Sequence, residues 1–415
     1  MQFYEFKETQ ERVILIGVQT EVGDDVEASL DELEELAETA GAETVAKVIQ
    51  NREAVHPGTY IGKGKIEEVA SLLRALDANG VICDDELSPA QLNNLERELD
   101  CKVMDRTLLI LDIFAGRAVS SEGKIQVELA QLRYRAARLV GLRESLSRLG
   151  GGIGTRGPGE KKLETDRRLI RTRISALKAE LAQVEKHREL IRGKRSRGNL
   201  KTAAIVGYTN AGKSTLLNTL TGAGILAEDK LFATLDPTTR VLELKDGQQI
   251  LLTDTVGFIR KLPHHLVEAF KSTLEEAKYA DYIIHVVDAS NPQAELQMFT
   301  VYETLRELGA TGKKIVTLLN KQDQVTGSGI RDLEADYTVK CSARTGEGLD
   351  EFKDVLAKLL AEDQIYLEEL YPYSEAGKIQ KIREFGSLLS EEYREDGIFV
   401  KARVPAEIFV SVMPK

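Results

Sequence analysis

Tryptophan is absent from the 415 residues, cysteine occurs three times, and there is no long hydrophobic run. Cys83, Cys101 and Cys341 are isolated and lack the spacing of a zinc site, so we expect reduced thiols. No apolar stretch approaches the roughly 20 residues that cross a bilayer. The first residues, MQFYEFKETQER, lack the apolar core of a signal peptide. These absences argue against a secreted or membrane-spanning protein and predict a cytoplasmic one with no membrane partner.

Acidic residues outnumber basic ones, 67 to 56, and the net charge is −11. This excess argues against a protein that merely coats nucleic acid. Residues 131–200 depart from the average, with 19 Lys or Arg against 7 Asp or Glu. A basic block inside an acidic protein is either an electrostatic footprint for a phosphate backbone or a solvated helix surface. Charge alone does not decide between the two.

The length predicts more than one domain. Residues 1–115 alternate strand-like and helix-like segments, among them the apolar strand 13–18, the helix 26–39 and a helix opened by Ser88-Pro89. Such alternation predicts an N-terminal α/β domain with a largely parallel sheet.

Residues 116–197 have a different pattern. Two helices are predicted, at 122–140 and 161–191, and the second carries apolar residues at three- and four-residue spacing. Between them lies Leu149–Gly159, which contains six glycines and a proline. We expect a helical hairpin with a basic, glycine-rich tip, followed by a linker at 193–198.

The last part of the chain is expected to form a nucleotide-binding domain at 198–362 and a small α+β appendage at 363–415. In the appendage, Ile398–Val404 and Glu407–Val412 are predicted strands, and residues 376–389 are a predicted helix. The function of the appendage is not readable from its sequence.

A phosphate-binding loop follows a predicted strand at Ala203–Val206. Residues 207–214 read GYTNAGKS and lead into an apolar helix, which is the strand–loop–helix context that G-x-x-x-x-G-K-S requires. Glycines allow backbone N–H groups to turn toward phosphates, Lys213 supplies a charge to the β- and γ-phosphates, and the Ser214 hydroxyl is a Mg²⁺ ligand.

Two further motifs follow at the ends of predicted strands. Asp254-Thr-Val-Gly257 places a carboxylate near Mg²⁺, usually through water, and a glycine N–H near the γ-phosphate. Asn320-Lys-Gln-Asp323 offers the Asp323 carboxylate to guanine N1–H and the exocyclic amine. Adenine has no matching hydrogens, so its binding would leave the carboxylate unsatisfied. Together the motifs predict a mixed, mostly parallel P-loop GTPase fold with helices on both faces of its sheet.

Two switch segments are expected, at 231–239 and 257–266. One threonine of the first completes the Mg²⁺ coordination, with Thr234 favoured over Thr238 and Thr239. Many GTPases place a water-orienting Gln after Asp-x-x-Gly, but here Phe258 stands there and cannot polarise water. Intrinsic hydrolysis should therefore be slow, with the missing group supplied by a partner or a cation. Asn210 is either a K⁺ ligand or a polar loop residue supporting the first switch.

The predicted site includes three catalytic residues, Lys213, Asp254 and Gly257. The residues expected to contact GTP are Gly207, Tyr208, Thr209, Asn210, Ala211, Gly212, Lys213, Ser214, Thr215, Phe232, Ala233, Thr234, Leu235, Asp236, Asp254, Thr255, Val256, Gly257, Asn320, Lys321, Gln322, Asp323, Ser342, Ala343 and Arg344.

Several long, irregular segments resemble the bacterial ribosome-associated GTPase family HflX, and the resemblance covers most of the chain. They lie in the nucleotide-binding domain and upstream of it, and include 232–240 (FATLDPTTR), 254–259 (DTVGFI), 85–91 (DELSPAQ), 127–131 (VELAQ) and 151–160 (GGIGTRGPGE). The resemblance also favours Thr234 as the Mg²⁺ ligand. The sequence differs from the usual family pattern in two places. Residues 161–162 are Lys-Lys where the family usually has Thr-Gln, and residues 136–139 are Ala-Ala-Arg-Leu where Leu-Pro-Arg-Leu is common.

The resemblance implies a GTPase that binds the large ribosomal subunit and separates ribosomal subunits, rescuing stalled or idle ribosomes under stress. We expect the free protein to be a monomer. The resemblance also implies that the N-terminal domain and the hairpin enter the peptidyl-transferase region of ribosomal RNA. A hairpin with Arg148 and Arg156 at its tip fits that role, and the expected RNA contacts are Arg148, Arg156, Lys161 and Lys162. The alternative is a GTP-dependent RNA-remodelling or ribosome-assembly factor acting on rRNA or tRNA.

Residues 58–65 have two interpretations. A second nucleotide site has been proposed there in the family, and a plain turn before a helix is the simpler interpretation.

Overall fold

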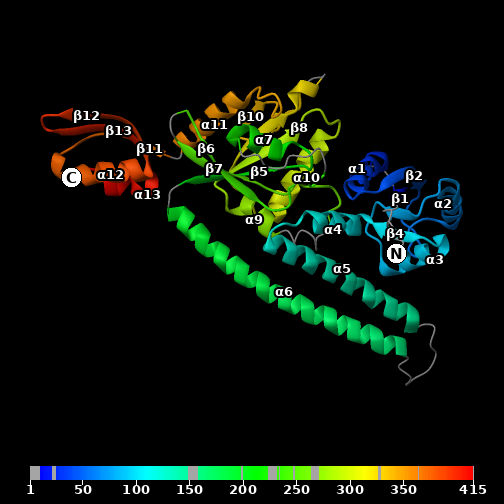
Figure 1. The fold of residues 1–415 in the computed structure, drawn as a ribbon. Coiled ribbons are helices and arrows are strands. Elements are labelled where there is room, and N and C mark those ends of the chain that lie inside the picture. The colour runs from blue at the N-terminus through cyan, green and yellow to red at the C-terminus, as the bar shows by residue number, and fades with distance from the viewer. Residues whose placement is uncertain are drawn as a thin grey trace, which may run out of the picture. The chain divides into compact units, whose positions relative to one another are not determined.

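The structure is a computed structural model (Figure 1). It describes residues 10–20, 25–147, 158–197, 200–222, 231–232, 234–245, 248–262, 271–325, 329–362 and 364–414. The chain divides into two compact units. One contains Met1–Glu185, Glu228–Asp236 and Arg260–Ser272, and the other contains Lys186–Ala227, Pro237–Ile259 and Thr273–Lys415.

The N-terminal domain is a four-stranded parallel sheet in the order β2-β1-β3-β4, as the alternation predicted. Its elements are β1 (Arg12–Gln19), α1 (Val26–Thr39), β2 (Glu43–Asn51), α2 (Lys63–Ala75), β3 (Gly80–Cys83), α3 (Pro89–Leu99), β4 (Lys102–Asp105) and α4 (Arg106–Arg117). The central strands β1 and β3 are apolar and buried, as expected for a parallel sheet covered on both faces. Ser88 caps α3 in a capping box with Gln91, which confirms the predicted helix start.

The predicted hairpin consists of α5 (Ser121–Ser147) and α6 (Pro158–Arg197), which run side by side (Figure 1). Its seam is apolar: Ile125 and Leu129 of α5 and Leu177 of α6 form one buried cluster. The linker predicted at 193–198 is wrong for residues 193–197, which continue α6. Lys and Arg are good helix formers, so this basic run extends the helix despite Gly193.

The nucleotide-binding domain contains a six-stranded sheet in the order β10-β9-β8-β5-β7-β6, in which only β6 is antiparallel to its neighbour. Its elements are β5 (Lys201–Gly207), α7 (Lys213–Thr221), β6 (Thr238–Glu243), β7 (Gln249–Asp254), α9 (Lys271–Tyr279), β8 (Tyr282–Asp288), α10 (Ala294–Glu307), β9 (Lys314–Asn320), η1 (Gln322–Gln324), β10 (Tyr337–Lys340) and α11 (Leu349–Glu362). The mixed, mostly parallel sheet confirms the predicted fold class. The parallel strands bring the ends of β5, β7, β8 and β9 to one edge of the sheet.

The C-terminal appendage is a three-stranded antiparallel sheet in the order β11-β13-β12 with two helices, so the α+β prediction holds. Its elements are β11 (Gln364–Tyr371), η2 (Tyr373–Glu375), α12 (Ala376–Phe385), β12 (Ser387–Arg394), β13 (Gly397–Pro405) and α13 (Ala406–Val412).

Two predictions within the appendage were wrong. Residues 407–412 form helix α13 and not a strand, because Pro405 opens the helix and Ile408, Phe409 and Val412 face the core at helical spacing. The helix predicted over 376–389 ends at Phe385, because Gly386 is extended and starts the turn into β12.

Candidate nucleotide site

The phosphate-binding loop connects β5 to α7 with the backbone geometry that its glycines permit. Gly212 has φ 95° and precedes Lys213, the first residue of α7. A Cβ on Gly212 would lie 2.3 Å from Asn320 Nδ2, and one on Gly207 would lie 2.2 Å from the Val286 carbonyl oxygen. Glycine is therefore required at both positions by the approach of β8 and β9 as well as by φ.

The Lys213 ammonium is enclosed by the loop. The residue is 6% exposed, and Nζ donates to the carbonyl oxygens of Tyr208 at 2.6 Å and Gly207 at 3.2 Å. Burial lowers the pKa of Lys213 to about 8, although the Asp254 carboxylate opposes the shift. An anionic phosphate here would compensate the charge that burial makes unfavourable.

Ser214 and Asp254 converge from α7 and β7. The Ser214 hydroxyl donates to Asp254 Oδ2 at 2.7 Å, and the Asp254 side chain is fully buried. A hydroxyl and a carboxylate are hard oxygen donors of the kind that Mg²⁺ prefers. The structure therefore brings together two of the residues that the sequence assigned to the metal, and their chemistry fits the ion.

The segment after Asp254 packs directly on the phosphate-binding loop. Thr209 N–H donates to the Phe258 carbonyl at 2.8 Å, and Phe258 N–H donates to the Gly207 carbonyl at 3.1 Å. A Cβ on Gly257 would lie 2.8 Å from both Lys213 Nζ and Thr209 Cα. The Phe258 side chain is 1% exposed, so it is a packing residue. The Thr255 hydroxyl fixes the segment to β5 by donating to the Ile205 carbonyl at 2.8 Å.

Asn320 ties the loops of the site together. Its Nδ2 donates to the Ala211 carbonyl, and its Oδ1 accepts from Ala343 N–H, both at 2.8 Å. Because Asn320 is 2% exposed and both ends of its amide are engaged, it acts as a brace between the phosphate-binding loop and the loop at Ser342–Arg344. Its position in the motif gave no sign of this role.

Asp323 and Lys321 lie at the end of β9, where the base is expected. Asp323 Oδ1 accepts from the Ser342 hydroxyl at 2.7 Å, which orients the carboxylate. Lys321 has φ 60° and pairs with Asp288 at 2.8 Å. Sequence reasoning missed Asp288. The available signal was its place as the polar end of the apolar strand β8, but a single aspartate there belongs to no motif.

The remaining predicted contacts fall into three groups. Thr215 and Gln322 lie beside the motif residues, and Arg344 is exposed. Four residues of the first switch segment belong to the same compact unit as the N-terminal domain: Phe232, Thr234, Leu235 and Asp236. Ala233, Arg148 and Arg156 lie outside the described residues, as do the side chains of Lys161 and Lys162 in α6.

Comparison with known proteins identifies the family. Three family models match the chain in succession: a GTP-binding GTPase N-terminal region at residues 27–115, a GTP-binding GTPase middle region at 117–195, and a 50S ribosome-binding GTPase at 202–321. The GTPase HflX of Lacrimispora saccharolytica is 68% identical over 98% of this chain and 97% of its own length.

The chain belongs to the GTPase HflX family. The Escherichia coli GTPase HflX is 42% identical over 95% of this chain and 94% of its own length. A solved structure of SsGBP in complex with GDP is 28% identical, with a TM-score of 0.48, over 84% of this chain and 98% of that one. As a GTPase HflX family member, the chain is a guanine-nucleotide-binding enzyme that hydrolyses GTP. Within the described ranges, no helix is long and apolar enough to span a membrane.

Proposed function

We propose that this HflX-family GTPase uses GTP binding and hydrolysis to control its binding to the large ribosomal subunit, and that its GTP form promotes separation of ribosomal subunits and rescue of stalled or idle ribosomes. Domain boundaries near residues 115, 197 and 362 belong to the same proposal. The observation that carries the dependence on a partner is Phe258. It is buried and bonded through its backbone to the phosphate-binding loop, at the place where a water-orienting side chain would otherwise stand.

The roles that we propose for the chain's own residues rest on the motifs and on the contacts of the phosphate-binding loop. Lys213 must leave the Gly207 and Tyr208 carbonyls to donate to the β- and γ-phosphates. Ser214 and Thr234 would supply hydroxyl ligands to Mg²⁺, and Asp254 would hold the ion through water. When bound, Mg²⁺ would offset the negative charge of the phosphates. Asp323 selects guanine, and Gly257 N–H contacts the γ-phosphate. Asn210, with φ 59°, is the assigned ligand if K⁺ supplies the missing positive charge.

The hairpin is the assigned RNA-binding element. Arg173 of α6 forms a bidentate pair with Glu128 of α5, at 2.7 and 2.8 Å, so this arginine joins the two helices. Arg167, Arg168 and Arg171 line a shallow recess on α6 with Glu164 and Thr165. Such side chains bind phosphates through charge and impart no base specificity. Arg148, Arg156, Lys161 and Lys162, near the tip, complete the proposed contact with RNA near the peptidyl-transferase centre.

The test is the GTP hydrolysis rate with and without purified large ribosomal subunits. We expect slow hydrolysis alone and stimulation of at least about tenfold by the subunits, because a partner must replace the group absent at Phe258. Stimulation by isolated tRNA would favour the RNA-remodelling alternative, and stimulation by lipid vesicles would contradict both. A rate equally fast without any partner would refute the argument from Phe258.

The matched variant reverses charge at the hairpin tip. Arg148→Glu combined with Arg156→Glu should weaken binding to the large subunit and reduce its salt dependence, while the affinity for GDP stays unchanged. The same binding curve as the wild type, at several salt concentrations, would show that the tip does not make the contact.

A further inference from the structure

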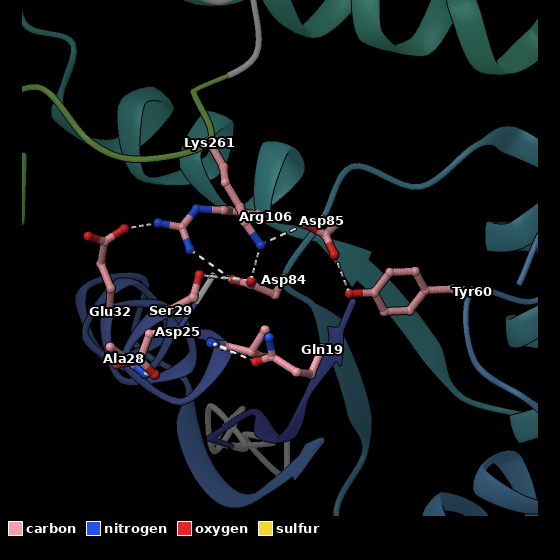
Figure 2. Close-up of polar contacts among 11 residues, drawn as sticks. Gln19, Asp25, Ala28, Ser29, Glu32, Tyr60, Asp84, Asp85, Arg106 and Lys261 are labelled. Carbon is pink, nitrogen blue, oxygen red and sulfur yellow. Dashed lines mark hydrogen bonds and ion pairs between the residues drawn. The ribbon is translucent and has the colours of Figure 1, made fainter. Parts of the chain in front are cut away.

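A lysine from the second switch segment is bound by two carboxylates of the N-terminal domain (Figure 2). Lys261 Nζ donates to Asp84 Oδ2 at 2.5 Å and to Asp85 Oδ1 at 2.7 Å. The two aspartates follow β3, at the carboxyl end of the parallel sheet, where α/β domains usually bind their ligands. Here that position holds a side chain from a segment four residues after Gly257.

The carboxylates are held in place from the other side. The Ser29 hydroxyl donates to Asp84, and Arg106 Nη1 donates to Asp84 Oδ1 at 2.9 Å. Arg106 also forms a close ion pair with Glu32. Asp84 and Arg106 are both 1% exposed. Tyr60 donates to Asp85 Oδ2 at 2.7 Å, as Figure 2 shows. The two carboxylates that bind Lys261 are therefore held in position by other side chains at the carboxyl end of the sheet, unlike those of an exposed surface ion pair.

The directions of the pKa shifts agree with the geometry of the contact. Burial lowers the pKa of Lys261, but the carboxylates of Asp84 and Asp85 more than offset this, and the pKa is raised overall. Burial raises the pKa of Asp84, and Lys261 opposes that rise. Each partner thus favours the charged form of the other, as in a partly buried ion pair whose separation leaves a desolvated charge.

The first switch segment is also fixed to the N-terminal domain, by independent contacts. Asp236 accepts from the Ser120 and Val119 N–H groups, at 2.8 and 3.1 Å, just before α5. A Cβ on Gly123 would lie 2.7 Å from Asp236 Oδ1, so the small residue permits the approach. The Phe232 ring packs edge-on against Phe114, with centroids 4.6 Å apart. Both contacts flank Thr234, the expected Mg²⁺ ligand.

We propose that the pairing of Lys261 with Asp84 and Asp85 is a latch through which the N-terminal domain senses the nucleotide held by the GTPase domain. This inference rests on the proposed function, in which Gly257 N–H contacts the γ-phosphate, and on the expected second switch segment that begins at Gly257. Gly257 and Lys261 are four residues apart, a reach of at most about 14 Å. In this proposal, a shift of Gly257 toward a γ-phosphate displaces Lys261 from its two carboxylates. The latch coexists here with Lys213 bonded to backbone carbonyls and packed on Gly257. A γ-phosphate bound by both Lys213 and the Gly257 N–H has to separate these two groups, and this separation moves the chain that leads to Lys261.

Thermodynamic reciprocity gives the direction of the effect. If a γ-phosphate weakens the latch, then removing the latch must strengthen binding of a GTP analogue relative to GDP by the same factor. Lys261→Ala should shift the ratio of dissociation constants for GDP and a non-hydrolysable GTP analogue by at least about fivefold toward the analogue. Asp85→Ala should shift the ratio in the same direction, and the double variant no further than Lys261→Ala alone, because the changes remove one contact.

The control is Lys47→Ala. Lys47 also bridges two carboxylates, Asp31 and Glu34, at 2.5 and 2.6 Å, with a side-chain exposure of 29% against 25% for Lys261. It lies in the same domain but outside the switches, so its replacement should leave the ratio unchanged.

Nucleotide affinities of the full-length protein, measured by fluorescence titration without ribosomes, decide the question. An unchanged ratio in Lys261→Ala, a shift toward GDP, or an equal shift in Lys47→Ala would overturn the latch. If Asp85→Ala fails to fold, Lys261→Ala and Lys261→Met still give the answer. Since the assay contains no ribosomes, a failure of ribosome stimulation would count against the proposed function and not against the latch.

Discussion

Guanine selection is assigned to a single carboxylate. Asp323 is oriented by the Ser342 hydroxyl at 2.7 Å and is expected to accept from guanine N1–H and the exocyclic amine. Asp323→Asn replaces one acceptor by a donor, which clashes with the guanine amine and complements the 2-oxo group of xanthine. We expect GDP affinity to fall by about 1.5–3 kcal/mol and the affinity for xanthosine diphosphate to rise. Calorimetric titration with both nucleotides measures the change.

Asp281→Asn is the matched control for that experiment. Asp281 caps the start of β5 by accepting from Thr202 N–H at 2.8 Å, at the opposite edge of the sheet from the motif residues. Its replacement should leave nucleotide choice unchanged. An Asp323→Asn protein that still preferred GDP would show that another group reads the base.

Motifs predict residues whose role is fixed by short-range geometry. Ser214 lies in the first turn of α7 and Asp254 is the last residue of β7, so their approach to 2.7 Å was predictable. The bracing role of Asn320 and the pairing of Lys321 with Asp288 were not. Both contacts depend on the order of the strands in the sheet. That order cannot be predicted from single residues at the ends of the strands.

The packing of α6 against α5 predicts how a substitution at Leu177 affects the hairpin. Leu177 of α6 is 1% exposed and packs with Ile125 and Leu129, so Leu177→Ala leaves a cavity in the seam. The expected cost is about 2–5 kcal/mol, confined to the hairpin. Hydrogen exchange should rise in α5 and α6, GDP affinity should stay constant, and stimulation by large ribosomal subunits should fall.

Leu169→Ala is the comparison on the same helix, because Leu169 is 61% exposed. It should leave hydrogen exchange unchanged. If it raised exchange as much as Leu177→Ala, the seam would have been assigned to the wrong face of α6.

Periodicity predicted the long helices and buried strands, and it failed where short segments are ambiguous. Residues 407–412 carry enough β-branched and aromatic residues to suggest a strand, yet Pro405 and the packing of Val412 against the sheet make a helix. Local sequence does not say whether such a run pairs with β13 or packs on it. Tertiary packing decides.

At the scale of the whole molecule, each domain has a core of its own. Separate buried clusters form around Ile14 in the N-terminal domain, Ile205 in the GTPase domain and Val400 in the appendage. The sequence predicted strands and helices in each of these three regions, and the structure has a separate sheet in each. It did not predict that residues 228–236 and 260–272 group with the N-terminal unit. A loop's docking partner depends on long-range charge pairs such as Lys261 with Asp84, which no local pattern encodes.

The separate cores predict the effect of removing the phosphate-binding lysine. Lys213 contacts its own loop, and the cluster around Ile14 contains no residue of that loop. Lys213→Ala should abolish tight nucleotide binding while β1–β4 keep the hydrogen-exchange protection of the wild type. GDP at 100 times its dissociation constant stabilises a binding-competent domain by about 2.7 kcal/mol, and this protection should be missing from β5 and α7 of the variant. Loss of protection in β1–β4 would instead mean that the two domains fold as one unit, and the boundary near residue 197 would be wrong.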